Sequence, residues 1–186
     1  MPLFRAILLG LLQGITEFLP ISSSGHLTVV PWLLHWDAPG LTFDTVVHLG
    51  TLVAVLLFFG ADILILARAW WDSVRRRKAE TPEARMAWLL IISAIPGALM
   101  GYFLEDFFTQ LFNSPLAASI FLLVTGGLIF VGERLSRPRI TLSQIHWRDA
   151  LTIGLAQGLA IAPGLSRSGA TISVGLLRGL GRAEAA

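Results

Sequence analysis

The segment Gln13–Leu27, QGITEFLPISSSGHL, places a carboxylate, three serines and a histidine in an apolar part of the chain. Gln13 and Glu17 are four residues apart, so in a helix both side chains lie on one face and can bind one ligand. Their oxygen atoms suit Mg²⁺ or Ca²⁺, which makes Glu17 and Gln13 candidate metal ligands. The alternative is a structural polar contact, such as an ion pair between Glu17 and an arginine.

The serines and the histidine follow Pro20 in ISSSGH. A serine just before a new helix is a good N-cap, and we expect one of the three to do only that. A helix amino terminus also presents free N–H groups to an anion, and Gly25 lets the backbone approach a ligand closely. Ser23 and Ser24 are therefore candidate nucleophiles or phosphate contacts, and His26 is a candidate nucleophile or general acid–base.

A second polar segment, PGLSRSGAT, lies near the other end of the chain. Arg167 offers a planar fork of N–H donors that matches phosphate oxygens, and the hydroxyls of Ser166, Ser168 and Thr171 are close in sequence. This pattern predicts a phosphate clamp. The alternative is an ion pair of Arg167 with Glu17 that only holds the two segments together.

The two segments belong to an internal repeat. With an offset of 144 residues and no gap, Gly10–Thr28 aligns with Gly154–Ile172, and seven of the nineteen positions are identical. The spaced Gly, Gln and Ser-x-Ser-Gly matches are more than apolar composition alone explains. In inverted-repeat membrane proteins, broken helices of the two copies meet near the midplane of the bilayer and form a binding site.

The elements that must position these residues are those of a membrane protein. The chain is 54% hydrophobic and only 14% charged, whereas soluble domains average about 25% charged residues. Three runs, Thr45–Ala61, Met86–Leu104 and Pro115–Gly132, lack Asp, Glu, Lys and Arg and are near the length of a membrane-spanning helix. The first run extends through Asp62 to Ala69.

The charge pattern predicts how these spans are oriented. Arg68–Arg85 carries six Lys or Arg, and Glu133–Asp149 carries four Arg, so both segments are expected on the cytoplasmic side. The segments Leu3–Leu34 and Ala150–Leu180 are each interrupted by Pro, Gly and Ser, and each is predicted to form a re-entrant helix–loop–helix hairpin. Because Arg5 would then lie outside, a single kinked span starting inside is the competing interpretation of the first segment.

The sequence therefore predicts an all-α polytopic membrane protein with a single membrane domain over residues 1–186. Its fold is an inverted repeat of a re-entrant hairpin plus three transmembrane helices. The first repeat covers residues 1–134, and the second begins at about residue 148 and is incomplete, since three further helices would complete it. The net charge of +2 does not indicate a nucleic-acid partner, and the lack of cysteine excludes disulfides. A homo-oligomer is left open.

QGITEFLPISSSGHL and PGLSRSGAT together closely resemble the two signatures of the bacterial undecaprenyl-diphosphate phosphatase family, the bacitracin-resistance membrane phosphatases. The resemblance follows all 186 residues in order and spacing. It implies that a polyprenyl diphosphate lipid, undecaprenyl diphosphate, is hydrolysed to the monophosphate carrier used in peptidoglycan synthesis. It also implies a divalent cation and an active site that faces the outer side of the bacterial plasma membrane.

The functional residues of the family correspond here to Glu17, Ser23, His26, Ser166, Arg167 and Thr171, and Gln13 stands where the family often has Glu. We expect Glu17 to hold the metal across the diphosphate and Arg167 to stabilise charge on the transferred phosphoryl group. Attack by Ser23, by His26, or by water assisted by His26 is left open. His48, inside the first span, lines the cavity or makes a helix–helix hydrogen bond.

Two rival functions remain. A lipid phosphatase of the phosphatidic-acid type also uses Ser-Gly-His and Ser-Arg signatures, but it needs a histidine six residues after its arginine, where this chain has Ser173. An anion or lipid transporter shares inverted repeats and half-helix termini, but it does not need Glu17 and His26 for bond cleavage. Release of phosphate without a gradient distinguishes a phosphatase from a transporter.

Overall fold

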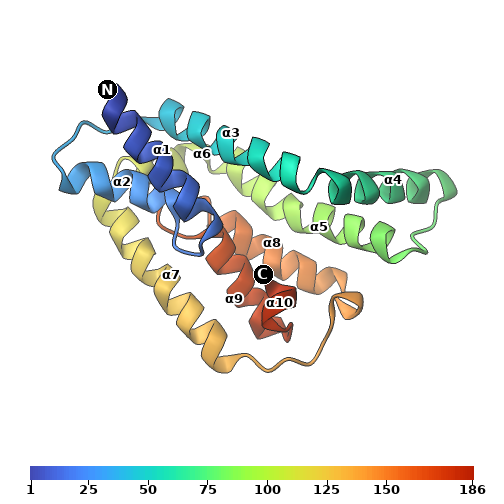
Figure 1. Cartoon of the computed structure of the whole chain (residues 1–186). Helices are drawn as coiled ribbons and strands as arrows, with labels where there is room; N and C mark the ends of the chain where they lie inside the picture. The colour runs from blue at the N-terminus through green and yellow to red at the C-terminus, as the bar shows by residue number, and fades with distance from the viewer.

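The computed structural model describes all 186 residues, which form helices and no strand (Figure 1). The elements in chain order are α1 (Leu3–Phe18), α2 (Ser23–Leu33), α3 (Leu41–Phe58), α4 (Gly60–Arg76), α5 (Pro82–Phe103), α6 (Glu105–Phe112), α7 (Pro115–Leu135), the short 3-10 turn η1 (Leu142–Gln144), α8 (Trp147–Leu159), α9 (Arg167–Arg178) and α10 (Arg182–Ala185). The predicted all-helical fold class is confirmed.

Three helices, α3, α5 and α7, are long and apolar enough to cross a membrane. They coincide with the three uncharged runs of the sequence, and together they indicate a multi-pass membrane protein. The starts of α5 and α7 are fixed locally, because Thr81 and Ser114 cap them and a proline follows each cap. A proline in the first turn loses no helical hydrogen bond, since its missing N–H would have no partner there.

The structure adds two elements that the sequence did not predict. The first span does not continue smoothly toward Ala69, because the helix breaks at Phe59 and restarts at Gly60 as α4, which packs antiparallel to α5 (Figure 1). The connector EDFFTQLFNS contains the helix α6, whose Phe108 is buried. No side chain of α3 is buried, so this helix presents most of its surface outward.

The helices α1 and α2 pack together as one helix–loop–helix hairpin, and α8 and α9 form a second. Ser22 caps α2 by accepting a hydrogen bond from the Gly25 N–H at 3.3 Å, and Ser166 caps α9 by accepting one from the Gly169 N–H at 3.1 Å. The helices start at Ser23 and Arg167, separated by the same 144 residues as the sequence repeat. The repeat is therefore present in local structure as well as in sequence.

The tips of the two hairpins, residues 16–25 and 160–169, touch each other. A Cβ atom added to Gly25 would lie 2.7 Å from the Gly164 Cα, so the two backbones are in direct contact. Helix α7 holds the second tip, because the Thr125 hydroxyl donates to the Gly164 carbonyl and accepts from the Ser166 N–H, both at 2.9 Å. Helices α2 and α9 both pack on α7, and α8 packs along α5. This framework fixes the place where the tips meet.

Candidate active site

A cavity of about 310 Å³ lies where the hairpin tips meet α3 and α6. Its polar wall has three sources: the first tip supplies Thr16, Glu17, Ser22, Ser23 and Ser24, the second tip supplies Ser166, Arg167 and Ser168, and α3 supplies Asp44, Thr45 and His48. Its apolar wall consists of Leu41, Phe112, Ala160, Ile161 and Leu165. A molecule in this cavity can therefore contact charged and hydroxyl groups as well as hydrocarbon.

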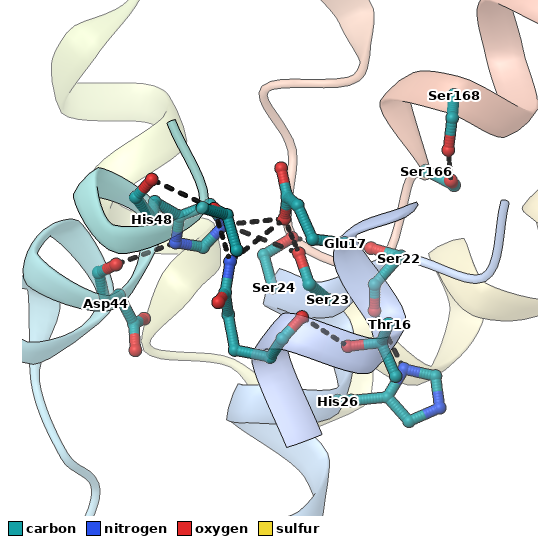
Figure 2. A network of polar contacts seen from close by, with 12 residues as sticks. Thr16, Glu17, Ser22, Ser23, Ser24, His26, Asp44, His48, Ser166 and Ser168 are labelled. Atoms are coloured by element: carbon teal, nitrogen blue, oxygen red, sulfur yellow. Dashed lines mark hydrogen bonds and ion pairs between the residues drawn. The ribbon is translucent and has the colours of Figure 1, made fainter. Parts of the chain in front are cut away.

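Glu17 is the centre of the polar contacts in the first tip (Figure 2). Its Oε2 atom accepts a short hydrogen bond from the Ser23 hydroxyl and a bond from Gln13 Nε2 at 3.3 Å, and it lies 3.2 Å from His48 Nε2. Gln13 also donates to the Thr51 hydroxyl at 3.2 Å. Three side chains from three helices therefore contact one carboxylate, and Thr51 supports it through Gln13.

His48 reaches the same place from α3. Its Nδ1 atom lies 2.6 Å from the backbone carbonyl oxygen of Asp44, and its Nε2 atom lies 3.3 Å from the Ser23 hydroxyl oxygen. A carbonyl oxygen only accepts hydrogen bonds, so Nδ1 carries a proton. This bond within α3 sets the orientation of the ring and directs Nε2 toward Ser23 and Glu17.

The second tip supplies positive charge and free N–H groups. The Arg167 guanidinium lies on the cavity wall, is exposed, and makes no hydrogen bond or ion pair within the chain. The backbone N–H groups of Arg167 and Ser168 have no acceptor within the chain, and neither do those of Ser23 and Ser24. Two helix amino termini and one free arginine therefore meet at one cavity, an arrangement that binds anions.

The structure brings together six of the predicted site residues on the cavity wall: Glu17, Ser23, Ser24, Ser166, Arg167 and Ser168. The predicted alternative of a Glu17–Arg167 ion pair is not formed, because the partner of Glu17 is His48. The Ser166 and Ser168 hydroxyls lie 3.2 Å apart, just as those of Ser22 and Ser24 lie 3.3 Å apart in the first tip.

Four other predicted site residues do not line the cavity. His26 turns back along α2 and donates from Nδ1 to the Ser22 carbonyl oxygen at 2.7 Å, away from Glu17 (Figure 2). Gly25 permits close approach as expected, but the backbone that approaches is that of Gly164 and not a ligand.

The remaining two support their neighbours. Thr171 donates to the backbone carbonyls of Arg167 and Ser168, at 3.0 and 3.2 Å, and so stabilises the first turn of α9. Gln13 lies behind Glu17 and is only 1% exposed. Its amide nitrogen faces the carboxylate, so Gln13 orients Glu17 from outside the cavity.

Two ionisable wall residues were not assigned from sequence. Asp44 was not singled out, and His48 was left open between a cavity residue and a helix–helix hydrogen bond. The signal was present, since Asp44 and His48 are four residues apart in an otherwise apolar span, and ionisable groups in such segments are usually functional. Sequence spacing alone did not show that this face of α3 meets the first tip.

The cavity wall offers oxygen atoms that suit a divalent cation. Glu17 Oε1 makes no hydrogen bond within the chain, and Asp44 Oδ1 is buried without a hydrogen-bond partner. A buried acceptor without a partner is unusual and suggests an ion or water there. No three Asp, Glu or His side chains form a complete protein cage. Mg²⁺ does not need one, since it is commonly held by one or two carboxylates and substrate phosphates.

Comparison with known proteins finds one matching family and relatives that share one name. The model of the family described as "Bacitracin resistance protein BacA" matches residues 6–186. A protein of Desulforudis audaxviator named "Undecaprenyl-diphosphatase" is 45% identical over 98% of this chain and 68% of its own length. A protein with the same name from Pelobacter propionicus is 46% identical over 100% of this chain and 68% of its own length. Another from Methanosphaera stadtmanae is 45% identical over 99% of this chain and 70% of its own length.

Proposed function

This chain belongs to the bacitracin resistance protein BacA family, and we propose that it hydrolyses undecaprenyl diphosphate to undecaprenyl phosphate and inorganic phosphate. The observation that carries the proposal is the cavity at the hairpin tips. There the unpaired guanidinium of Arg167 and two helix amino termini are on the same wall as the Glu17–Ser23 hydrogen bond. The relatives named undecaprenyl-diphosphatase support the same reaction.

Ser23 is the nucleophile that the geometry favours. It lies on the cavity wall and its hydroxyl donates to Glu17, whereas the ring of His26 is directed elsewhere. In the proposed first step the Ser23 oxygen bonds to the terminal phosphorus, and its proton moves to Glu17 Oε2. The bridging P–O bond breaks, and undecaprenyl phosphate leaves with the electron pair.

In the second step water attacks the phosphoserine. The Ser23 oxygen leaves phosphorus and recovers its proton from Glu17, and both protons of the water depart with inorganic phosphate. Arg167 and the free N–H groups of the two tips stabilise the charge that develops on the equatorial oxygens during each transfer. The helix N–H groups are held in place by the backbone before the reaction, so they need not reorganise as charge develops.

A divalent cation held by Glu17 would neutralise charge on the diphosphate oxygens. We propose Mg²⁺ in preference to Ca²⁺, because one carboxylate and substrate oxygens suit Mg²⁺ better than the larger coordination shell of Ca²⁺. The proposal does not keep Gln13 as a ligand, since Gln13 lies outside the cavity.

The apolar wall suits the lipid part of the substrate. Leu41 and Phe112 lie on the α3–α6 side, and Ile161 and Leu165 lie on the second tip. A prenyl chain attached to a diphosphate bound in the cavity can therefore contact hydrocarbon side chains. This combination of walls supports a lipid diphosphate in preference to a soluble one.

We further propose that the two hairpins enter the membrane from opposite faces and that the cavity opens to the outer side. The basic connector between α4 and α5 favours a cytoplasmic position for that end of the molecule. The cavity lies at the opposite ends of α3 and α5, next to the connector that contains α6 and carries no Lys or Arg. Protease or thiol-labelling access to a cysteine introduced near Asp106, in intact cells, tests the orientation.

The proposed reaction is tested by phosphate release from undecaprenyl diphosphate in detergent, with no gradient present. The unchanged chain should release phosphate. The substitutions Arg167→Ala and Glu17→Ala should each lower turnover by at least ~10²-fold, the scale expected when a transition-state contact is lost.

Arg148→Ala is the matched control, because Arg148 stacks on Trp147 outside the cavity and its loss should leave turnover unchanged. A chain that binds the lipid without releasing phosphate would favour transport. Near-normal turnover of Arg167→Ala would contradict the role given to the guanidinium.

A further inference from the structure

We propose that His48 is a positioning residue for this reaction, which holds Ser23 and Glu17 in the arrangement that attack on phosphorus requires. The inference rests on the proposed function and adds a residue that the sequence signatures do not contain. It assigns to α3 a part in catalysis beyond that of a membrane span.

The first line of evidence is the set of contacts that the imidazole makes. Nε2 lies 3.2 Å from Glu17 Oε2 and 3.3 Å from the Ser23 oxygen, while these two residues share a short hydrogen bond with each other. The three side chains form a closed triangle of contacts. Removing any one corner leaves the other two with more rotational freedom.

The second line of evidence is how the ring itself is held. Nδ1 donates to the Asp44 carbonyl oxygen one turn earlier in α3, at 2.6 Å. This bond is made within one helix, so it exists whatever the hairpin does. His48 is therefore oriented from within α3, and its Nε2 atom faces the first tip.

The third line of evidence is the pattern along α3. The polar side chains of Asp44, His48 and Thr51 are spaced at i, i+4 and i+7, which places them on one face of the helix. Asp44 and His48 line the cavity, and Thr51 accepts a hydrogen bond from Gln13, which in turn donates to Glu17. None of the residues of α3 is buried, so apolar packing does little to hold this helix against the tip. The polar contacts of His48 and Thr51 therefore fix the position of α3 relative to the first tip.

The comparison with His26 sharpens the assignment. His26 belongs to the signature of the first tip, but its Nδ1 is bonded to Ser22 and it does not line the cavity. His48 is far from both signatures in sequence and contacts the proposed nucleophile directly. Proximity in space thus identifies a different histidine from the one that proximity in sequence favoured.

The test compares His48→Ala with His48→Gln in the detergent-solubilised chain. An alanine leaves Ser23 and Glu17 without their α3 contact. A glutamine places an amide nitrogen at a similar reach and can donate to both, but it does not transfer protons. For His48→Ala we expect kcat to fall by about 10- to 100-fold, the scale of a small displacement of reacting groups. We expect KM to stay within about twofold, because the phosphate contacts of Arg167 are untouched.

His48→Gln should keep kcat within about threefold of the unchanged chain, since the glutamine amide can still donate to Glu17 and Ser23. Val46→Ala is the matched control on α3, because Val46 is 60% exposed and lies on the other face of the helix. It should change neither constant.

A second measurement does not depend on activity. Amide hydrogen exchange of the peptide that covers residues 19–25 should become faster in His48→Ala and stay unchanged in His48→Gln and Val46→Ala. If the unchanged chain releases no phosphate, the proposed function fails, while the exchange measurement still tests whether His48 orders the tip. Equal loss of kcat in His48→Gln and His48→Ala would overturn the positioning role. Unchanged kcat and exchange in His48→Ala would overturn it as well.

Discussion

Ser23 and His26 lie three residues apart in the first turn of α2, yet they face different surroundings. Ser23 is held between Glu17 and His48, whereas the ring of His26 is bonded back to the Ser22 carbonyl. Ser22 has a φ of 65°, in the left-handed region that non-glycine residues seldom adopt. The His26 bond helps to hold this unusual backbone, so His26 supports the tip from behind while Ser23 faces the cavity.

This division of roles predicts different effects for the serines of the first tip. Ser23→Ala should lower phosphate release by at least ~10²-fold, because it removes the nucleophile and the hydrogen bond to Glu17. Ser24→Ala should cost much less, because the Ser24 hydroxyl contacts Ser22 and its backbone N–H remains. Acid-quenched reactions with labelled substrate should trap phosphate on Ser23. Label recovered on His26, or normal turnover of Ser23→Ala, would contradict the assignment.

At the residue scale, the sequence was informative where chemistry is local. That Glu17, Ser23, Ser24 and Arg167 lie at one cavity could be expected from the helix starts and the spacing of the two motifs, and their catalytic roles stay a prediction. His48 and Asp44 could not be assigned, because their role depends on which face of α3 meets the tip. That face is set by contacts between residues about 30 positions apart, which periodicity in one helix does not reveal.

At the scale of elements, the open end of the second hairpin is closed by an ion pair. Asp149 in the first turn of α8 accepts from Arg178 in the last turn of α9, with the Arg178 Nε at 2.6 Å, and it also accepts from the His146 N–H at 2.9 Å. Burial of the Asp149 carboxyl opposes its ionisation, but the hydrogen bonds from the His146 N–H and from Arg178 outweigh burial and hold the pKa of Asp149 below its ordinary value of 3.8. Asp149 is therefore more readily ionised in the folded chain than in the unfolded one.

The consequence is a pH-dependent contribution to stability. Because the folded pKa is lowered, the contribution of Asp149 is complete above its ordinary pKa of about 4 and is lost as pH falls through the lower, folded pKa. Asp149→Asn should therefore lower the unfolding temperature at pH 7, and the difference from the unchanged chain should shrink below about pH 4. Thermal unfolding in detergent across this range measures it. A difference that stays constant with pH would show that the charge of Asp149 is not involved.

The helix boundaries show what hydrophobic composition alone does not predict about the elements. An uncharged run predicted the three spans, because only helices satisfy their own backbone in hydrocarbon. The same criterion missed the break at Phe59, after which the helix restarts at Gly60, because apolar residues continue on both sides of the break. It also missed α6, because a helix of two turns with four polar residues resembles an ordinary connector.

At the scale of the whole molecule, the contact between Gly25 and Gly164 determines whether one cavity exists. A Cβ atom on Gly25 would meet Gly164 backbone at 2.7 Å, and one on Gly164 would lie 2.2 Å from the Ala118 carbonyl oxygen. Gly164 also has a φ of 93°, which a side chain would strain. Neither neighbour is a flexible side chain, so relief requires the two tips to move apart at Gly25, or the second tip to move away from α7 at Gly164.

Gly25→Ala should accordingly lower both activity and stability by separating the tips. Gly127→Ala in α7 is the control, because a Cβ there meets nothing within 4 Å and alanine favours helix over glycine by about 1 kcal/mol. We expect Gly25→Ala to lose at least ~10-fold in kcat, since Glu17 and Arg167 must act on one phosphate. Phosphate release and unfolding temperature of both variants provide the check. Equal activity of the two would show that the tip contact is dispensable.

The repeat could be predicted at this scale because both copies keep the same cap, the same serine pair and the same helix start. Its pairing into one cavity could be expected only by analogy with other inverted repeats. The close approach at Gly164 also depends on α7, because the Thr125 hydroxyl of that helix is hydrogen-bonded to the backbone of Gly164 and Ser166. No feature of the second signature itself indicates that partner.

The two tips that form the cavity are synthesised at different times. Arg167 is made about 150 residues after Glu17, which at ordinary elongation rates is a delay of roughly 7 to 30 s. During that interval the first tip has its acid and serines, but the guanidinium of the second tip has not yet been made. We therefore expect the nascent protein to be inactive until Arg167 has been translated and the second hairpin packs against the first.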